Sequence, residues 1–300
     1  MDFPPFEQYR ELIRLAVAED LGEAGIDGDV TSRLTIPAEA TGGGTIVQKA
    51  GGVPCGLPAV EHVCGLFDER LRVAVEPGVE GVFAEASTKN LRPLARIEGP
   101  LRSVLAAERT VLNLLGRLSG IATLTRRHVE QTAGTNADVY DTRKTTPGWR
   151  HLEKYAVRRG GGRNHRVGLY DMVLVKDNHL AALAAEGVTD LAAAVAELVR
   201  RSRAEDAERR IEVEVDTEAQ FAQVLAVPGV DVILLDNMGP PALARCVAAR
   251  DAAAHQPALE ASGGVTLESV AAVARTGVDR IAIGALTHSA TNLDVGLDFD

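Results

Sequence analysis

The chain has 300 residues, of which 46% are hydrophobic, 25% charged and 4% aromatic, and its formal net charge is −10. This balance indicates an ordinary globular protein with an aliphatic core, and it argues against the broad basic face that nucleic-acid binding requires. No stretch approaches the roughly 20 apolar residues of a membrane span, and the N-terminus does not read as a secretory signal. The three cysteines show no metal-binding spacing. We therefore expect a cytoplasmic protein without nucleic-acid or membrane partners.

The first third of the chain predicts an α/β domain. Apolar residues recur at helical spacing between residues 7 and 19, and a polar, glycine-bearing loop follows them. Residues 42–98 contain short β-like runs broken by glycine and proline, with one helix near residues 58–67. Residues 101–131 then give two helical stretches, LRSVLAAERTVLNLLGRL and SGIATLTRRHVEQT. We expect residues 1–115 to form an N-terminal α/β sandwich domain.

From residue 137 onward, short β-rich runs alternate with helical stretches, which indicates βα units around a parallel sheet. The predicted strands are residues 137–140, 172–175, 211–215, 232–235, 258–261 and 280–283. Nearly every run ends in a polar or glycine residue, and the carboxyl ends of barrel strands carry the chemistry. An open doubly wound sheet is the alternative, since it also binds ligands at strand ends. We favour a TIM-like parallel α/β barrel over residues 116–285.

A dense group of positive charges lies in residues 141–176, DTRKTTPGWRHLEKYAVRRGGGRNHRVGLYDMVLVK. Nine of the 32 Lys and Arg residues fall here against three acidic residues, so the segment carries +6 in a chain of net charge −10. Like charges at this density repel one another unless anions share the space. The segment therefore predicts a pocket for a ligand with several negative charges.

The predicted anion-binding set consists of Arg143, Lys144, His165, Arg166 and Lys176. Lys176 follows the apolar run 172–175 and so stands at a strand end; a lysine that reaches to the solvent rim is the alternative. For His165 the alternative is a hydrogen-bonded structural histidine.

Other basic residues have simpler interpretations. We expect the arginines of the helical stretch 150–159 on a solvated face, because Glu153 and Lys154 accompany them. Composition alone would place Arg109, beside Glu108, on a helix surface.

Two loops after late strands have the features of a phosphate site. The first, EASGGVT at residues 260–266, leaves a predicted strand and enters a helix, so free N–H groups and the helix dipole can face an anion. Gly263 and Gly264 allow a close approach of the backbone. The second loop, IGALT at residues 283–287, follows the next strand, and barrels often seat a phosphate between their last two such loops.

Two carboxylates stand at strand ends, Glu214 in IEVEVDT and Asp236 in LLDNM. They are suited to holding ribose hydroxyls or a Mg²⁺ ion bound to pyrophosphate, because Mg²⁺ favours one or two carboxylates together with ligand phosphates. Simple alternation along a strand would also explain Glu212, Glu214 and Asp216, but three acids on one buried face are costly. At least one of them should therefore meet a ligand or a cation.

The ordered motifs closely resemble the quinolinate phosphoribosyltransferase family. The resemblance runs from about residue 100 to 288 and is carried by ERTVLNLLGRLSGIATLT, the segment 141–176 with the following DNHL, IEVEVDT, LLDNM and EASGGVT. It implies that quinolinate, a pyridine 2,3-dicarboxylate, attacks C1 of phosphoribosyl pyrophosphate in the presence of Mg²⁺. Pyrophosphate and CO₂ leave, and nicotinate mononucleotide remains for NAD biosynthesis.

The resemblance also implies roles for individual residues. Quinolinate is surrounded by Arg109, Arg143, His165, Arg166 and Lys176, with Lys144 near the pyrophosphate. The implied catalytic residues are Lys144, Lys176, Glu214 and Asp236. Further implied substrate contacts are Thr142, Ser262, Gly263, Gly264, Ile283, Gly284 and Ala285. Arg109 would enter the neighbouring subunit's site, so the functional unit is expected to be at least a homodimer. The tail, residues 286–300, would return to the N-terminal domain.

Three other functions remain open from the residues. A Schiff-base aldolase would use Lys176 as its nucleophile, but an iminium lysine needs no cluster of cations. A related phosphoribosyltransferase could use another acceptor and release no CO₂. A binding protein without turnover could keep the anion pocket, although the acids Glu214 and Asp236 hinder pure anion binding.

Overall fold

The computed structural model describes residues 2–185, 187 and 190–299. The chain forms two compact units: the first comprises Met1–Arg126, Lys144–Gly161 and Leu286–Asp300, and the second comprises Arg127–Arg143 and Gly162–Ala285. The division therefore differs from the predicted one, because residues 116–126 and 144–161 belong to the first unit.

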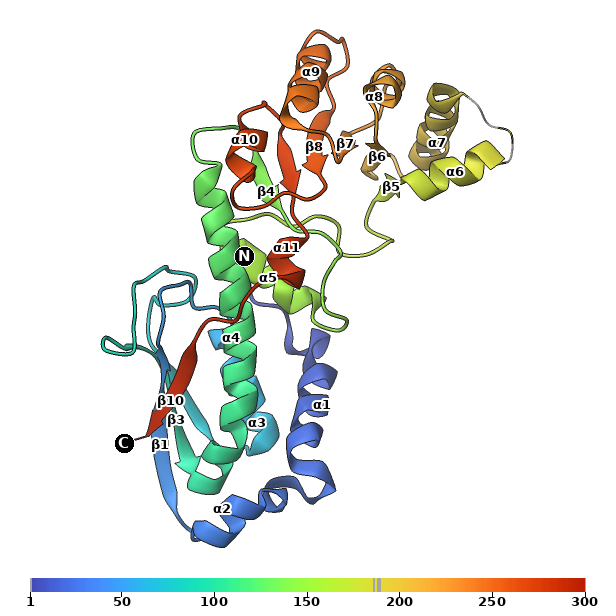
Figure 1. The fold of residues 1–300 in the computed structure, drawn as a ribbon. Helices are drawn as coiled ribbons and strands as arrows, with labels where there is room; N and C mark the ends of the chain where they lie inside the picture. The colour runs from blue at the N-terminus through green and yellow to red at the C-terminus, as the bar shows by residue number, and fades with distance from the viewer. Residues whose placement is uncertain (1, 186, 188–189, 300) are drawn as a thin grey trace. The chain divides into compact units, whose positions relative to one another are not determined.

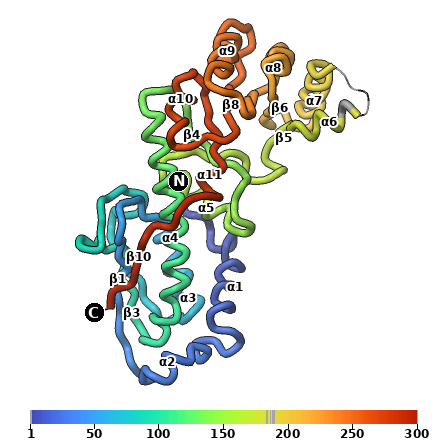
Figure 2. The backbone as a smooth tube through the Cα atoms, viewed as in Figure 1, coloured from blue at the N-terminus to red at the C-terminus, as the bar shows by residue number. Residues whose placement is uncertain are grey.

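The first unit contains a four-stranded antiparallel sheet in the order β10-β1-β3-β2. Its strands are β1 (Thr41–Gln48), β2 (Arg72–Val75), β3 (Arg92–Pro100) and β10 (Val295–Phe299). Ile46 of β1 pairs with Ala95 of β3 on one side and with Leu297 of β10 on the other. The C-terminal segment thus completes the N-terminal sheet, as the tube shows where β10 runs beside β1 (Figure 2).

Helical segments accompany this sheet in the first unit. They are η1 (Phe6–Gln8), α1 (Arg10–Leu21), η2 (Gly22–Gly28), α2 (Val30–Thr35), η3 (Leu57–Ala59), α3 (Val60–Phe67), α4 (Leu101–Gln131, which continues into the second unit), α5 (Arg150–Arg159) and α11 (Ala285–His288, which starts at the last residue of the second unit). The helices expected near 7–19 and 58–67 are confirmed as α1 and α3. The glycine-bearing loop after α1 is instead a 3₁₀ segment.

The two helical stretches expected over residues 101–131 are one helix, α4, so that prediction was wrong. Two of its glycines, Gly116 and Gly120, lie where the C-terminal tail crosses the helix at close range. A Cβ atom added to Gly120 would lie 2.1 Å from the carbonyl oxygen of Thr291, and Leu293 donates its N–H to the Gly116 carbonyl at 2.9 Å. The sequence signal that indicated a helix break therefore marks a packing contact within an unbroken helix.

The helix α5 is largely buried, contrary to the expected solvated face. Glu153 is fully buried and accepts hydrogen bonds from the Thr146 hydroxyl at 2.8 Å and from Nη2 of Arg117 at 2.8 Å. Arg117 also donates to the carbonyls of Thr287 and Ala290. Glu153 and Arg117 therefore connect α4, α5, the loop before α5 and the tail.

The second unit is built on a six-stranded parallel sheet in the order β4-β9-β8-β7-β6-β5, the strand set of the α/β barrel (Figure 1). The strands are β4 (Asp138–Tyr140), β5 (Val173–Val175), β6 (Ile211–Val215), β7 (Val232–Asp236), β8 (Ala258–Ser262) and β9 (Arg280–Ala282). All six predicted strands are confirmed within a residue at each end. Val213, Ile233 and Ile281 are fully buried, as expected for a parallel sheet covered on both faces.

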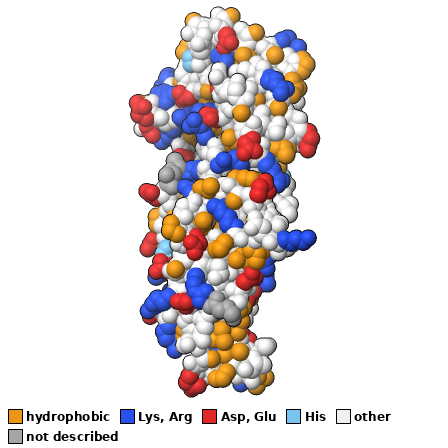
Figure 3. Space-filling model, turned by 90° about the vertical axis from the view of Figure 1, so that its left-hand side faces the viewer, with side chains coloured by type: hydrophobic (Ala, Val, Ile, Leu, Met, Phe, Trp, Pro, Cys, Tyr) orange, Lys and Arg blue, Asp and Glu red, His pale blue; other side chains and the backbone are white. Residues whose placement is uncertain are grey.

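Helices follow the strands of the second unit, and they are α6 (Asp177–Ala185), α7 (Leu191–Glu205), α8 (Glu218–Leu225), α9 (Pro240–Asp251) and α10 (Val270–Ala274). Thr217 caps α8 through a capping box with Gln220, so the helix begins directly after β6. No helix in the described part of the chain combines the length and apolar character needed to cross a bilayer. On the face drawn in Figure 3, basic and acidic side chains are interspersed.

Candidate functional site

Most of the predicted site residues belong to the second unit and lie at one edge of its sheet. Parallel strands bring their carboxyl ends to the same edge. Thr142 and Arg143 follow β4, Lys176 follows β5, Glu214 lies in β6, Asp236 ends β7, Ser262 ends β8, and Ile283 follows β9. The sheet topology therefore gathers residues that are up to 141 positions apart in the chain, from Thr142 to Ile283.

Arg143 and Arg166 form the cationic part of this edge. The Nε atoms of both guanidinium groups are buried and donate to no acceptor within the described residues. Burial lowers the pKa of Arg166, the charge of Arg143 lowers it further, and Glu212 opposes the shift. Arg166 is buried and Arg143 is half-buried. Two neighbouring cations that repel one another and hold unused Nε donors are suited to a ligand with several acceptor oxygens.

Asp141 fixes the segment that carries Arg166. This fully buried carboxylate accepts a hydrogen bond from Nδ2 of Asn164 at 2.6 Å and one from the backbone N–H of His165 at 2.8 Å. Arg163 pairs with Tyr140 of β4 through an isolated parallel bridge. Arg166 itself lines a cavity of about 480 Å³ with Tyr170, Met172 and His179 among the neighbouring side chains.

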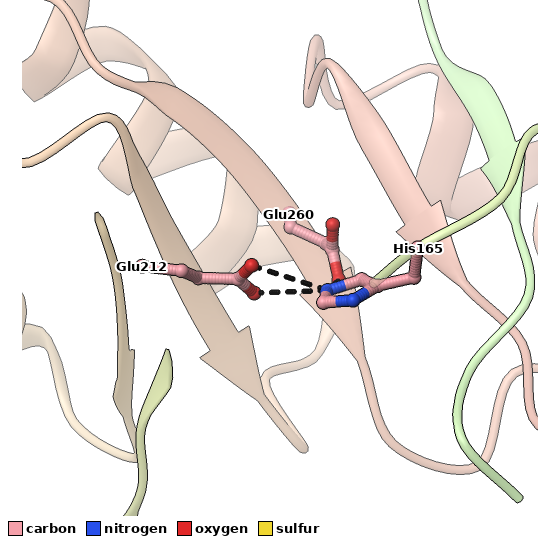
Figure 4. Close-up of side chains that lie close together, drawn as sticks. All are labelled: His165, Glu212 and Glu260. Atoms are coloured by element: carbon pink, nitrogen blue, oxygen red, sulfur yellow. Dashed lines mark hydrogen bonds and ion pairs between the residues drawn. The ribbon is translucent and has the colours of Figure 1, made fainter. Parts of the chain in front are cut away.

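His165 turns its ring toward two buried acids in the sheet (Figure 4). Its Nε2 atom lies 3.1 Å from Oε2 of Glu212 on β6 and 3.3 Å from Oε1 of Glu260 on β8. Burial opposes a charged imidazole, but Glu212 and Glu260 outweigh it and raise the pKa of His165 to about 10. Glu260 was not predicted as a partner of His165, although the motif EASGGVT places this acid inside a predicted strand.

Lys176 is ion-paired with Glu214. We expected at least one acid of this strand to meet a ligand or a cation, and for Glu214 the protein itself supplies a cation. The Lys176 side chain is 43% exposed to solvent, whereas the Glu214 side chain is 8% exposed. Asp216, two residues further on, is exposed. The pair puts one positive and one negative group at adjacent strand ends.

The ends of β7 and β8 are joined by a tight backbone contact. Asn237 has a positive φ of 54° and donates its N–H to the Ser262 carbonyl at 2.9 Å. Gly263 has a φ of +97°, and a Cβ there would lie 2.2 Å from Oδ1 of Asn237. Only glycine fits at this position. Asp236 accepts a hydrogen bond from Nδ2 of Asn237 at 2.5 Å.

The expected phosphate loops differ in how they enter their helices. After Gly264, the chain forms turns before α10 begins at Val270, so this loop does not lead directly into a helix as predicted. In the second loop, α11 begins at Ala285 directly after Gly284. Ile283 donates its N–H to the Tyr140 carbonyl at 2.9 Å, which ties this loop to β4.

Two predicted site residues, Arg109 and Lys144, belong to the first unit. Arg109 is exposed on α4. Lys144 is also exposed, and its carbonyl accepts a hydrogen bond from the Thr287 hydroxyl at 2.9 Å.

Comparison with known proteins identifies the family. The model "Quinolinate phosphoribosyl transferase, N-terminal domain" matches residues 29–119, and the corresponding C-terminal domain model matches residues 121–298. The chain belongs to the quinolinate phosphoribosyl transferase family. It is 42% identical over 297 residues to the nicotinate-nucleotide pyrophosphorylase [carboxylating] of Mycobacterium leprae, covering 98% of each chain. It is 35% identical over 309 residues to quinolinate phosphoribosyltransferase [decarboxylating] 1b of Nicotiana tabacum, covering 99% of this chain and 83% of that one.

Solved structures of the family support the fold. The nicotinate-nucleotide pyrophosphorylase of Francisella tularensis superposes with a TM-score of 0.85 at 30% identity and covers 100% of both chains. The Ehrlichia chaffeensis enzyme gives a TM-score of 0.83 at 34% identity, with 97% of this chain and 98% of that one covered. The predicted fold class, an N-terminal α/β domain followed by an α/β barrel, is thus confirmed.

Proposed function

We propose that this chain transfers the phosphoribosyl group of phosphoribosyl pyrophosphate to quinolinate and releases pyrophosphate and CO₂. The product is nicotinate mononucleotide, an intermediate of NAD biosynthesis. Membership of the family over residues 29–119 and 121–298 supports this assignment. The observation that carries it in the structure is the pair of arginines Arg143 and Arg166, whose Nε donors are buried and meet no acceptor among the described residues.

The two carboxylates of quinolinate match this pair chemically. A guanidinium offers donors in a planar fork, which suits a carboxylate better than a single ammonium does. Each charge-assisted hydrogen bond contributes on the order of 1.5–3 kcal/mol. Arg143 and Arg166 bind the dicarboxylate, and Lys176 adds a third cation after the end of β5.

Glu214 and Asp236 act on the ribose. As pyrophosphate leaves C1, positive charge develops on the sugar, by analogy with glycoside cleavage. Fixed carboxylates near this charge stabilise the transition state electrostatically. Lys176 holds Glu214 in place, and Lys144 contributes charge on the pyrophosphate side. Ser262, Gly263, Gly264 and the turn of Ile283, Gly284 and Ala285 cradle the 5′-phosphate with backbone N–H groups.

The chemical steps balance without a redox partner. The pyridine nitrogen forms a bond to C1 while the C1–O bond to pyrophosphate breaks. When the 2-carboxylate departs as CO₂, the electron pair of the broken bond stays on C2, where the adjacent positive pyridinium nitrogen stabilises it. A proton then bonds to C2 through that pair. The protein's role in this second stage is to hold the intermediate and exclude water.

Mg²⁺ enters this proposal with the substrate. The carboxylates of Glu214 and Asp236 come from adjacent strands, and such oxygen ligands fit a Mg²⁺ that keeps most of its contacts with phosphate and water. Glu214 is engaged by Lys176 and Asp236 by Asn237, so a substrate-borne ion fits this donor set better than a resident one. The ion would neutralise charge on the pyrophosphate.

We also assign a homodimer and a cytoplasmic location to this enzyme. The exposed position of Arg109 on α4 suits a residue that serves the neighbouring subunit's site. The three cysteines are buried and unpaired, as is usual in a reducing compartment.

The assignment is tested by incubating the protein with phosphoribosyl pyrophosphate, Mg²⁺ and quinolinate and by chromatography of the products. We expect nicotinate mononucleotide, and we expect no mononucleotide when nicotinate, which lacks the 2-carboxylate, replaces quinolinate. Equal turnover of nicotinate would instead indicate a related enzyme with another acceptor.

A further inference from the structure

The loop that carries Lys144 is anchored on both sides of its next residue. The carbonyl oxygen of Lys144 accepts a hydrogen bond from the Thr287 hydroxyl at 2.9 Å. Thr146 donates its backbone N–H to Oε2 of Glu153 at 3.1 Å and its hydroxyl to Oε1 of Glu153 at 2.8 Å. The backbone at Lys144 is therefore held in place, although the Lys144 side chain is exposed.

The sequence that follows Thr146 adds a tight turn to this loop. The backbone N–H of Trp149 donates to the Thr146 carbonyl at 3.0 Å, and Gly148 has a φ of +81°. Proline and glycine, in that order, stand at the two central positions, where a type II turn favours proline and requires a positive φ, respectively. Few conformations are therefore open to the chain between Lys144 and the start of α5.

The two anchors of the loop are joined through Arg117 on α4. Glu153 and Thr287 are both fully buried. Arg117 donates to Oε1 of Glu153 from Nη2 at 2.8 Å and from Nε at 3.2 Å, and it also donates to the Thr287 carbonyl. These contacts form a closed circuit within the first unit, which we call the Glu153 network. Its members are Lys144, Thr146, Glu153, Arg117 and Thr287.

The Glu153 network is stiff because its central charge is buried. The Glu153 carboxylate is matched by one guanidinium and two further donors, and the loss of any partner would leave part of a buried charge unpaired. Among the five members of the network, only Lys144 has a substrate contact in the proposed function. The other four therefore form a support behind one exposed lysine.

We propose that these four residues are positioning residues, which hold the backbone of Lys144 so that its ammonium group meets the pyrophosphate of phosphoribosyl pyrophosphate. This inference rests on the proposed function, which puts Lys144 on the pyrophosphate side. A lysine is a point charge on a flexible stem, so only its backbone can be fixed before the substrate binds. A displacement of about 1 Å in such a group can lower a rate about 100-fold.

The hold on the loop is tested first without any substrate, by amide hydrogen exchange in the whole protein. Thr287→Val keeps the shape of the side chain and removes its donor, so exchange at Thr146 and Trp149 should become at least about fivefold faster. Thr287→Ser keeps the donor and should match the wild type. Thr132→Val is the matched control, because the buried Thr132 also donates its hydroxyl to a backbone carbonyl at 2.9 Å. Unchanged exchange in Thr287→Val overturns the proposal.

Steady-state rates separate positioning from a general loosening of the protein. Thr287→Val should lower kcat/KM for phosphoribosyl pyrophosphate at least about 10-fold, whereas Thr287→Ser and Thr132→Val should stay within about twofold of the wild type. The Kd for quinolinate, titrated calorimetrically without the second substrate, should change less than about twofold in all three variants. A matching loss of quinolinate affinity in Thr287→Val would show that its effect is not directed at Lys144, and it overturns the proposal.

A double-mutant cycle shows whether Thr287 acts through Lys144. In a Lys144→Ala background, Thr287→Val should change kcat/KM less than about twofold, because the group that the network positions is already gone. A further loss of about 10-fold in this background overturns the proposal, since it would assign Thr287 a role that is independent of the lysine.

A milder variant carries the test if Thr287→Val does not fold. Thr146→Val changes an exposed residue and removes only the hydroxyl bond to Glu153, while the backbone N–H of residue 146 keeps its own bond. It should lower kcat/KM for phosphoribosyl pyrophosphate about threefold, with no effect in Lys144→Ala. Wild-type rates in Thr146→Val would then overturn the proposal. If the wild type forms no nicotinate mononucleotide while the exchange results hold, the proposed function fails and the ordering of the loop by the network stands.

Discussion

The ammonium group of Lys176 is ion-paired with the carboxylate of Glu214 across the neighbouring parallel strands β5 and β6. Lys176→Ala should lower kcat/KM by at least about 100-fold, equivalent to about 2.7 kcal/mol of transition-state stabilisation, because it removes the proposed substrate contact and releases Glu214. Initial rates with both substrates measure this. Lys89→Ala, on an exposed lysine of the first unit, should change kcat/KM less than about twofold. Equal rates for the two variants would remove Lys176 from the site.

Arg143→Ala should weaken quinolinate binding and lower kcat/KM by at least about 100-fold, because it removes a guanidinium that we assign to the dicarboxylate. Arg245→Ala is a suitable control, since Arg245 is exposed and pairs with Glu218 on a neighbouring helix. The separate effects on Kd and kcat distinguish binding from positioning. Near-normal kinetics of Arg143→Ala would contradict the assignment of the anion site.

The strands of the second unit were predictable because each is a short apolar run with a polar end. A parallel sheet buries both faces, so sequences such as IEVEV and VILLD can be recognised without homologues. The unbroken course of α4 was not predictable. Gly116 and Gly120 lower the helical signal in this stretch, and their reason, the tail that packs against them, lies far along the chain. Contacts between distant segments leave no local signal.

The site was predictable in its cations and only partly in its acids. Arg143, Arg166 and Lys176 could be found because positive charge is dense in residues 141–176. The partnership of His165 with Glu212 and Glu260 could not, since these residues meet only through the order of β6, β7 and β8. The burial of Glu153 was missed for the same reason, because its partner Arg117 lies 36 positions away on another helix.

The shared-site proposal predicts complementation between inactive variants. Arg109→Ala and Lys176→Ala proteins should each have low activity, and a mixture that has exchanged subunits should regain up to about one quarter of wild-type activity, because one of the two sites in each mixed dimer is intact. Differently tagged subunits and mass measurements verify the exchange. Activity that stays at the level of the separate variants after exchange would contradict the role of Arg109 in the partner's site.

The tail crossing of α4 predicts opposite effects at two helical glycines. Gly120→Ala should destabilise the protein, because its Cβ would lie 2.1 Å from the Thr291 carbonyl oxygen, a backbone atom that cannot turn away. Gly65→Ala on α3 has nothing within 4 Å and should stabilise it by up to about 1 kcal/mol through helix propensity. Urea unfolding measures both. A stabilising Gly120→Ala would show that the tail does not cross there.

The buried cluster of His165, Glu212 and Glu260 also predicts how stability depends on pH. The pKa of His165 is raised from 6.5 to about 10, and the pKa of Glu260 is raised too. Between pH 6.5 and about 10 the folded state therefore holds more protons than the unfolded chain. The stabilisation from His165 is fully present below pH 6.5 and is lost as pH rises through about 10. Unfolding free energies from urea titrations should fall over this range, and less steeply in Glu260→Gln than in wild type. An identical slope in both proteins would contradict the prediction.

The measurement that tests the central claim most directly is the stoichiometry of gas and mononucleotide. With quinolinate labelled in its 2-carboxylate, phosphoribosyl pyrophosphate and Mg²⁺, the account predicts one labelled CO₂ for each nicotinate mononucleotide formed, and neither product from an Arg143→Ala protein within the same time. A mononucleotide that retains the label, or CO₂ released at an equal rate without phosphoribosyl pyrophosphate, would contradict it.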